Sequence, residues 1–412
     1  MIGYKEHTLP NGLQLIVHED HSSPMVCLNI LYKVGSRNEQ PNKTGFAHLF
    51  EHLMFGGSKN IENFDEPLQK VGGDNNAFTS PDITNYYVTI PSNNVETAFW
   101  LESDRMMSLS FDPKVLEVQR KVVIEEFKQR YLNQPYGDLW LKLRPLAYKV
   151  HPYQWATIGK EISHIEDATM DDVKAFFGKF YDPSNAVLVV AGDISEEKAL
   201  QLTEKWFGPI PTSGKVKMEI PNEPDQNEER FLEIKDKVPS AAIHKTYHMP
   251  GRVGKSYHQA DLFSDILGRG KSSILHQRLV NDLQWMSSIS AYVTGSFDPG
   301  LLTISGKIND GLSIDKVNKE IESVVAKVLE AGVEEQEVQK TKNQAESTII
   351  FSETELLNRA MGLAYAAFLG NIDLVNDELV IVRAVTKEDI LDAGRKIMKP
   401  TNCSTVYYFP QN

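Results

Sequence analysis

Residues 48 to 52 read His-Leu-Phe-Glu-His, and three of these five side chains can take part in metal chemistry. Residues four apart lie on one face of a helix, so His48 and His52 can reach one metal ion while Glu51 projects beside them. The order H-x-x-E-H inverts the H-E-x-x-H zinc motif and is the inverzincin signature. Histidines at this spacing can also be core residues or part of a polar stripe. The surrounding sequence favours a metal site with a base beside it.

The composition is that of an ordinary globular protein. At 412 residues the chain is too long for one compact domain, and hydrophobic and charged contents of 41% and 24% exclude disorder and fibres. The formal net charge of −13 disfavours nucleic-acid binding, which needs Lys and Arg against phosphates. Cys27 and Cys403 lie far apart and outside any C-x-x-C pattern. We therefore expect the metal ligands to be histidine and carboxylate.

The N-terminal residues show no targeting signal. Residues 1–7 lack a basic stretch followed by an apolar core, and no apolar run in the chain approaches the length of a membrane span. We therefore predict a cytoplasmic protein without a membrane span, or a periplasmic one if a leader has been removed.

The chain repeats part of its own sequence. A segment that starts at Thr169 recurs from Thr386, 217 residues later, with an acidic turn, a lysine, a Pro-x-Asn turn and an apolar strand in the same order. Glu117–Arg120 recurs as Glu337–Lys340, 220 residues later. Several matches in one order favour an internal duplication. We predict two homologous domains, 1–222 and 223–412, because Pro, Gly and charged residues cluster around the boundary.

Each half mixes two kinds of apolar periodicity. Alternation over residues 13–17 and 86–90 predicts strands, and the patterns over 96–107 and 114–131 predict helices. The fold class expected is α+β, with a mostly antiparallel sheet packed with helices in each half.

The second copy lacks the metal motif. Residues 47–54 align with 260–267, and the apolar positions are kept. The polar trio of the motif is replaced, in order, by Asp261, Ser264 and Asp265. A motif that only packed would have little reason to differ chiefly at its polar residues, so the first domain is expected to bind zinc and the second to be inactive.

Four motifs together resemble the pitrilysin family of zinc peptidases, which includes insulin-degrading enzyme and the mitochondrial processing peptidase, and especially its short bacterial members. They are Leu9–Leu13, Gly45–Phe55, Gly72-Gly73 with Asn76–Ser80, and Val122–Glu126. The resemblance covers essentially the whole chain. It implies a zinc endopeptidase with one Zn²⁺ per chain that hydrolyses extended or unfolded peptides, and Glu51 would be the general base on zinc-bound water.

A catalytic zinc site needs a third protein ligand. The resemblance implies Glu126, which lies 74 residues past His52, while Glu125 is the competing assignment because one sequence does not fix the helix register. Family members often carry a second glutamate two turns before this ligand, and this chain has Gln119 there. Such a change near a ligand costs about 10- to 100-fold in affinity or activity, so we expect tuning and not loss.

The resemblance also points to a substrate-binding strand. Asn76, Ala77, Phe78 and Thr79 would form an edge strand whose backbone pairs with peptide main chain, which gives little sequence preference. The alternative is an ordinary sheet edge beside the Gly-Gly turn.

The inactive domain of the family supplies an Arg and a Tyr that hold substrate. Those positions fall on Val280 and Ser287, and Arg278 and Tyr292 are nearby but off register. We therefore expect a dimer, in which a partner chain, itself perhaps without the zinc motif, completes the site.

Two rival functions were weighed. A non-catalytic scaffold or peptide-binding subunit of a processing complex is disfavoured by the intact motif. A nucleotide-binding enzyme is suggested by residues 268–272, but Asp265 stands where the phosphate loop requires glycine.

Overall fold

The computed structural model describes residues 1–214 and 218–411, which divide into two compact units. Both units are discontinuous in sequence. The first comprises Met1–Gln129, Trp155–Ile220 and Ile350–Asp377, and the second comprises Arg130–Gln154, Pro221–Ile349 and Glu378–Asn412. In these described ranges, no helix is long and apolar enough to cross a membrane.

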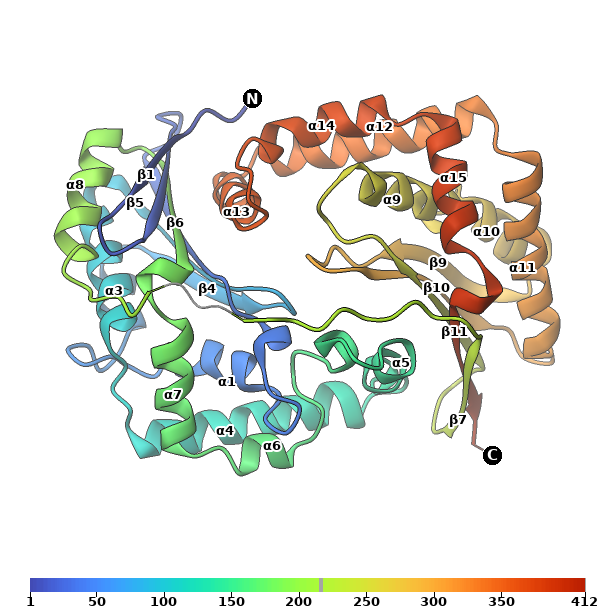
Figure 1. The fold of residues 1–412 in the computed structure, drawn as a ribbon, viewed down its shortest axis with the longest axis horizontal. Helices are drawn as coiled ribbons and strands as arrows, with labels where there is room; N and C mark the ends of the chain where they lie inside the picture. The colour runs from blue at the N-terminus through green and yellow to red at the C-terminus, as the bar shows by residue number, and fades with distance from the viewer. Residues whose placement is uncertain (215–217, 412) are drawn as a thin grey trace. The chain divides into compact units, whose positions relative to one another are not determined.

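The first unit is built on a six-stranded sheet (Figure 1). The strand order is β1-β2-β6-β3-β5-β4, and all neighbours are antiparallel except β2 and β6. The strands are β1 Lys5–Thr8, β2 Gln14–Glu19, β3 Met25–Tyr32, β4 Asp74–Thr79, β5 Thr84–Pro91 and β6 Ala186–Gly192. β6 is central and buried at every position, as its apolar run requires, whereas β4 forms an edge.

Helices pack on this sheet and around its edge. They are α1 Phe46–Leu53, α2 Asp65–Lys70, α3 Val95–Met107, α4 Pro113–Phe127, α6 Ser163–Glu166, α7 Met170–Phe180, α8 Glu196–Trp206 and α13 Leu356–Phe368. Short 3-10 turns are Ser36–Asn38, Ser92–Asn94 and Pro183–Asn185, and a π-helical turn, Lys128–Leu132, follows α4. Alternate residues of three strands, such as Ile16, Cys27 and Val189, form one core cluster with α13, as the two-residue period of a strand requires.

The second unit is built on a five-stranded sheet of order β7-β11-β8-β10-β9, in which only β7 and β11 are parallel (Figure 1). The strands are β7 Arg230–Asp236, β8 Ala242–Met249, β9 Met286–Val293, β10 Gly300–Ile308 and β11 Cys403–Pro410. The helices are α5 Leu139–Ala147, α9 Lys255–Gly268, α10 Ile274–His276, α11 Ile314–Ala331, α12 Glu335–Ser352, α14 Leu374–Ala384 and α15 Lys387–Ile397. Short turns are Pro152–Gln154 and Pro400–Asn402, with a π-helical turn at Gln277–Asp282.

The two sheets have the same topology. Strands β2, β6, β3, β5 and β4 occur in the same order and relative direction as β7, β11, β8, β10 and β9, and the single parallel pair falls at the same place. The repeated segments at Thr169 and Thr386 also begin helices, α7 and α15, with the same capping box. The structure confirms the predicted α+β class and the internal duplication.

Each half of the chain contributes one helix to the sheet of the other half. α5 lies in the first half of the sequence but packs on β11, β7 and β8, and α13 lies in the second half but packs on β6, β3 and β2. The predicted boundary near residue 222 falls beside the passage from Ile220 to Pro221, but a single cut does not describe the exchanged helices. The functional division into domains 1–222 and 223–412 stays a prediction.

Candidate metal centre

The predicted metal motif forms helix α1, Phe46–Leu53. Gly45 precedes it with φ of 87°, and a Cβ there would lie 2.7 Å from the carbonyl oxygen of Ile158, so glycine is required on both counts. The apolar residues of the helix are buried, and Phe50 stacks on Phe176 at a centroid distance of 4.8 Å. This packing leaves the polar face of α1 half-buried, with its side chains available for chemistry.

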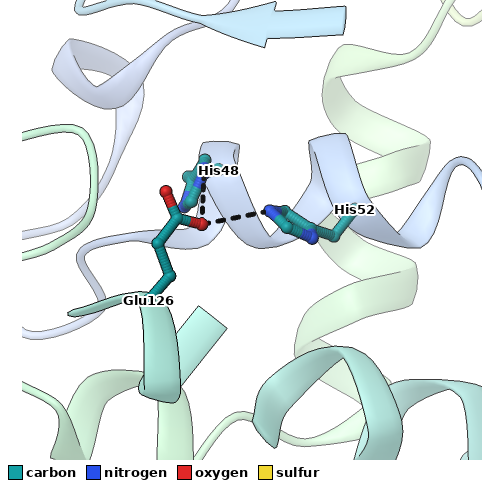
Figure 2. A group of neighbouring side chains, drawn as sticks. All are labelled: His48, His52 and Glu126. Atoms are coloured by element: carbon teal, nitrogen blue, oxygen red, sulfur yellow. Dashed lines mark ion pairs between the residues drawn. The ribbon is translucent and has the colours of Figure 1, made fainter. Parts of the chain in front are cut away.

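Figure 2 shows that His48 and His52 converge on Glu126, which α4 supplies. The Nε2 atom of each histidine lies 3.6 Å from Oε2 of Glu126, and the potential ligand atoms all lie within 4.8 Å of one another. The side chains are 13 to 23% exposed. Tetrahedral ligands about 2.1 Å from a zinc ion lie roughly 3.4 Å apart, so both the spacing and the two-nitrogen, one-oxygen donor set fit zinc.

The neighbouring glutamate faces elsewhere. Glu125 is 59% exposed and pairs with Lys128 at 2.8 Å. The structure therefore brings Glu126 and not Glu125 to the histidines. Gln119 lies on the same helix, but in the described part of the chain its side chain makes no hydrogen bond to the three clustered residues, so its predicted effect on them stays a prediction.

Glu51 is held by the edge strand. The hydroxyl of Thr79 donates a hydrogen bond to Oε2 of Glu51 at 2.6 Å. Thr79 ends β4, which pairs with β5 on one side only, so the predicted strand Asn76–Thr79 does form an edge of the sheet. The sequence assigned Thr79 to substrate, and the structure adds a contact with the expected base. A hydrogen bond to the ionised carboxylate favours the proton-accepting form.

Glu39 is a site residue that the sequence did not indicate. Its two carboxylate oxygens accept hydrogen bonds from the backbone N–H groups of Gly45 and Ala47, at 2.9 and 2.8 Å, at the start of α1. The side chain is buried, and this burial raises its pKa to about 8 against the opposing effect of those hydrogen bonds. Glu39 stands too far before α1 to match a capping pattern, so only the folded loop shows its role.

The raised pKa of Glu39 predicts a pH-dependent stability. The folded protein holds a proton that the unfolded chain releases above pH 4.5, so the free energy of unfolding should fall as the pH rises from about 5 to 8. Glu39→Gln should flatten this slope by about 1 kcal/mol or more over that range. Melting temperatures of the chelator-treated protein at several pH values check this, with exposed Glu125→Gln as the control. Parallel curves for wild type and Glu39→Gln would contradict it.

The residues aligned with the family's Arg and Tyr have other surroundings. Val280 packs against the core of the second unit, and the hydroxyl of Ser287 lies 3.5 Å from the carbonyl oxygen of Lys307. Arg278 pairs with Glu320 at 2.7 Å. Tyr292 lies on the edge strand β9 and is 37% exposed. The structure therefore places neither an arginine nor a tyrosine at the two aligned positions.

Together these features define a duplicated α+β fold of the zinc-peptidase type, with a His-His-Glu cluster in one copy. Residues 15–145 match the family model "Insulinase (Peptidase family M16)", and residues 167–345 match "Peptidase M16 inactive domain". The chain belongs to peptidase family M16, the pitrilysin family, and is of its short bacterial type.

Relatives span the full chain. "Zinc protease PqqE" of Helicobacter pylori is 30% identical over 98% of this chain and 92% of its own length. "Uncharacterized zinc protease YmxG" of Bacillus subtilis is 26% identical over 84% of each chain. A crystal structure of a protease from Helicobacter pylori superposes with a TM-score of 0.93, at 28% identity and full coverage of both chains. These relatives support a zinc peptidase and confirm the predicted family.

Proposed function

We propose that this chain is a zinc endopeptidase that hydrolyses extended or unfolded peptides. The observation that carries the proposal is the convergence of His48, His52 and Glu126 on one point, with Glu51 held beside them by Thr79. Two neutral imidazoles and one carboxylate leave a bound zinc ion positively charged and leave a position for water. The proposed content is one Zn²⁺ per chain.

The chain's own residues then have distinct roles. When bound, zinc supplies Lewis acidity and lowers the pKa of a coordinated water to about 7. Glu51 accepts a proton from the attacking water and delivers it to the leaving amine as the C–N bond breaks. Thr79 keeps the carboxylate of Glu51 oriented and ionised through its hydrogen bond. Gln119 would adjust the metal site from α4 without binding the ion.

Substrate is proposed to add to the edge of the first sheet. Strand β4 alternates between exposed and half-buried residues, and its free edge can pair with the main chain of a peptide. Main-chain pairing recognises an extended conformation and not a particular sequence. Asn76, Ala77 and Phe78 would therefore line the substrate path, while Thr79 would contact both the strand edge and Glu51.

A partner chain is proposed to complete the site, because Val280 and Ser287 offer no cationic or phenolic group. One relative, 29% identical over 51% of this chain, is named "Mitochondrial-processing peptidase subunit beta" of Saccharomyces cerevisiae and is by its name a subunit. We propose a dimer for this chain, with a homologous chain that need not carry the zinc motif. The alternative, a non-catalytic scaffold or peptide-binding subunit, is favoured by the same two positions.

The location is proposed as cytoplasmic, with the periplasm as the alternative. The second is favoured by a solved relative described as "the periplasmic protease PqqL from Escherichia coli", although that match, at 20% identity, bears on the fold alone. Fractionation of cells that express the full-length gene would decide between the two.

Replacing Glu51 by glutamine should abolish peptide hydrolysis without loss of zinc. General acid–base catalysis contributes about 10²- to 10⁴-fold, so turnover of an unstructured quenched-fluorescence peptide should fall by at least that factor. Zinc per chain, measured by elemental analysis, should stay at one, and Glu125→Gln should behave as wild type.

The same assay separates the alternatives. Turnover by the wild-type chain alone would remove the partner requirement. Turnover only after a noncatalytic relative is added would support the dimer. Zinc-loaded wild-type protein that stays inactive in both cases would leave the scaffold alternative and contradict the proposed peptidase.

A further inference from the structure

The second unit carries a hollow between the same two helices that form the metal centre in the first. It has a volume of about 720 Å³ and lies between the C-terminal end of α9 and one face of α12. α9 aligns with α1, and α12 contains Glu337–Lys340, the repeat of Glu117–Arg120 in α4. The duplication has therefore kept a hollow beside this helix pair while changing its lining.

The change of lining reverses the ligand chemistry. Asp265 stands at the position of His52 and pairs with Arg269 at 2.8 Å, and the same guanidinium donates to the hydroxyl of Thr348 on α12 at 2.9 Å. Arg269 thus crosses from one wall of the hollow to the other. Lys340 lies on the α12 wall and donates to the carbonyl oxygen of Ser272 at 3.1 Å. Two cations line the second hollow, where the first copy gathers the ligands of a cation.

Amide groups supply the rest of the recognition surface. Gln339 donates to Oδ1 of Asn343 at 2.8 Å, which leaves the oxygen of Gln339 as an acceptor and the nitrogen of Asn343 as a donor. Donors and acceptors side by side match the N–H and C=O groups of a peptide. Phosphate groups that are fully ionised offer acceptors only, so this mixture favours a peptide over an inorganic anion.

The local charge balance also limits the ligand. Asp265 pairs with Arg269 and Glu337 with Lys340, so the two cations are already balanced and a multiply charged nucleotide gains little. The loop 269–273 follows helix α9 and not a strand, which excludes the phosphate-loop geometry as well. A single carboxylate can still take two parallel hydrogen bonds from the guanidinium.

We propose that this hollow is a second peptide site, which binds the C-terminal carboxylate of a peptide through Arg269 and Lys340 and its last main-chain amides through Gln339 and Asn343. The volume lies within the range of about 300 to 1,000 Å³ typical of ligand pockets, enough for several residues. Gly270 adopts a φ of +78° at the rim, and no atom lies within 4 Å of the Cβ position there. The rim is thus open to a peptide that enters from solvent.

The test measures binding and not turnover, so it goes beyond the proposed peptidase activity and does not depend on it. The Glu51→Gln chain, loaded with zinc, is titrated into a short dye-labelled peptide with a free C-terminal carboxylate and, separately, into its amidated twin, and fluorescence anisotropy is recorded. The carboxylate form should bind about tenfold more tightly or better, since hydrogen bonds to a charged group are among the stronger ones. Inorganic phosphate and ATP should not compete.

Further variants decide where the carboxylate binds, since zinc could also hold one. Arg269→Gln and Lys340→Gln should each remove most of the preference for the carboxylate, and Asn343→Leu should weaken both peptides. Lys319→Gln, an exposed lysine on α11, is the control and should change nothing. Circular dichroism would show that each variant is folded. Equal binding of the two peptides, or an unchanged preference in folded Arg269→Gln and Lys340→Gln, would overturn the proposal, as would competition by phosphate.

Discussion

Glu126→Gln should lower the zinc affinity of the chain by more than about 100-fold, while Glu125→Gln should leave it unchanged. Glu126 provides the only carboxylate oxygen of the cluster, 3.6 Å from both histidine nitrogens, and a neutral amide oxygen cannot replace its charge. Changes around a ligand already cost about 10- to 100-fold, so loss of a direct ligand should exceed that range. Competition with a chromogenic chelator measures the affinity of both variants.

The pair is a matched control because the two residues are adjacent on α4 and differ in direction. Glu125 points to solvent and pairs with Lys128, so its replacement removes the same charge at the same distance along the helix. Equal losses of affinity in the two variants would mean that general negative charge, and not coordination by Glu126, attracts the metal. A larger loss in Glu125→Gln would reverse the assignment.

The metal centre was largely accessible from the sequence because its elements have strong periodic signals. His48 and His52 share a helical face by spacing alone, and the apolar residues of α1 fix which face is buried. Glu126 could be assigned only with its neighbour as an alternative, because the two residues differ by one step in helix register. The choice needed the packing of α4 against α1.

Two features depended on tertiary structure and had no local signal. Glu39 reaches the start of α1 through a loop, and a lone glutamate in a loop looks like any solvated charge. The exchange of α5 and α13 is also invisible locally, because a helix has the same apolar stripe whichever sheet it covers. The repeat at Leu146–Tyr148 and Leu363–Tyr365 marks these two helices as counterparts, but it does not say which sheet each one covers.

Arg105→Met should be the most destabilising single change away from the metal ligands. Arg105 and Glu102 form a two-point ion pair on α3, at 2.9 and 2.5 Å, and both side chains are 1% exposed. Phe64, Tyr86 and Phe55 surround the guanidinium at centroid distances of 4.2, 4.5 and 5.3 Å. Loss of the arginine leaves a buried carboxylate without its partner, which typically costs about 3 to 5 kcal/mol. Chemical denaturation of the metal-free protein measures the loss.

The double variant Glu102→Leu with Arg105→Met separates charge from packing. Replacing both partners of a buried ion pair by apolar residues of similar volume is often neutral, so the double variant should recover most of the stability. Burial raises the pKa of Glu102, and Arg105 opposes that rise. Without Arg105 the pKa should rise further, so the single variant should lose stability more steeply than wild type as the pH increases from about 5 to 8, and the double variant should not. If the double variant is as unstable as the single one, the aromatic cage and not the uncompensated charge is what stabilises this part of the first unit, and the cost should then be independent of pH.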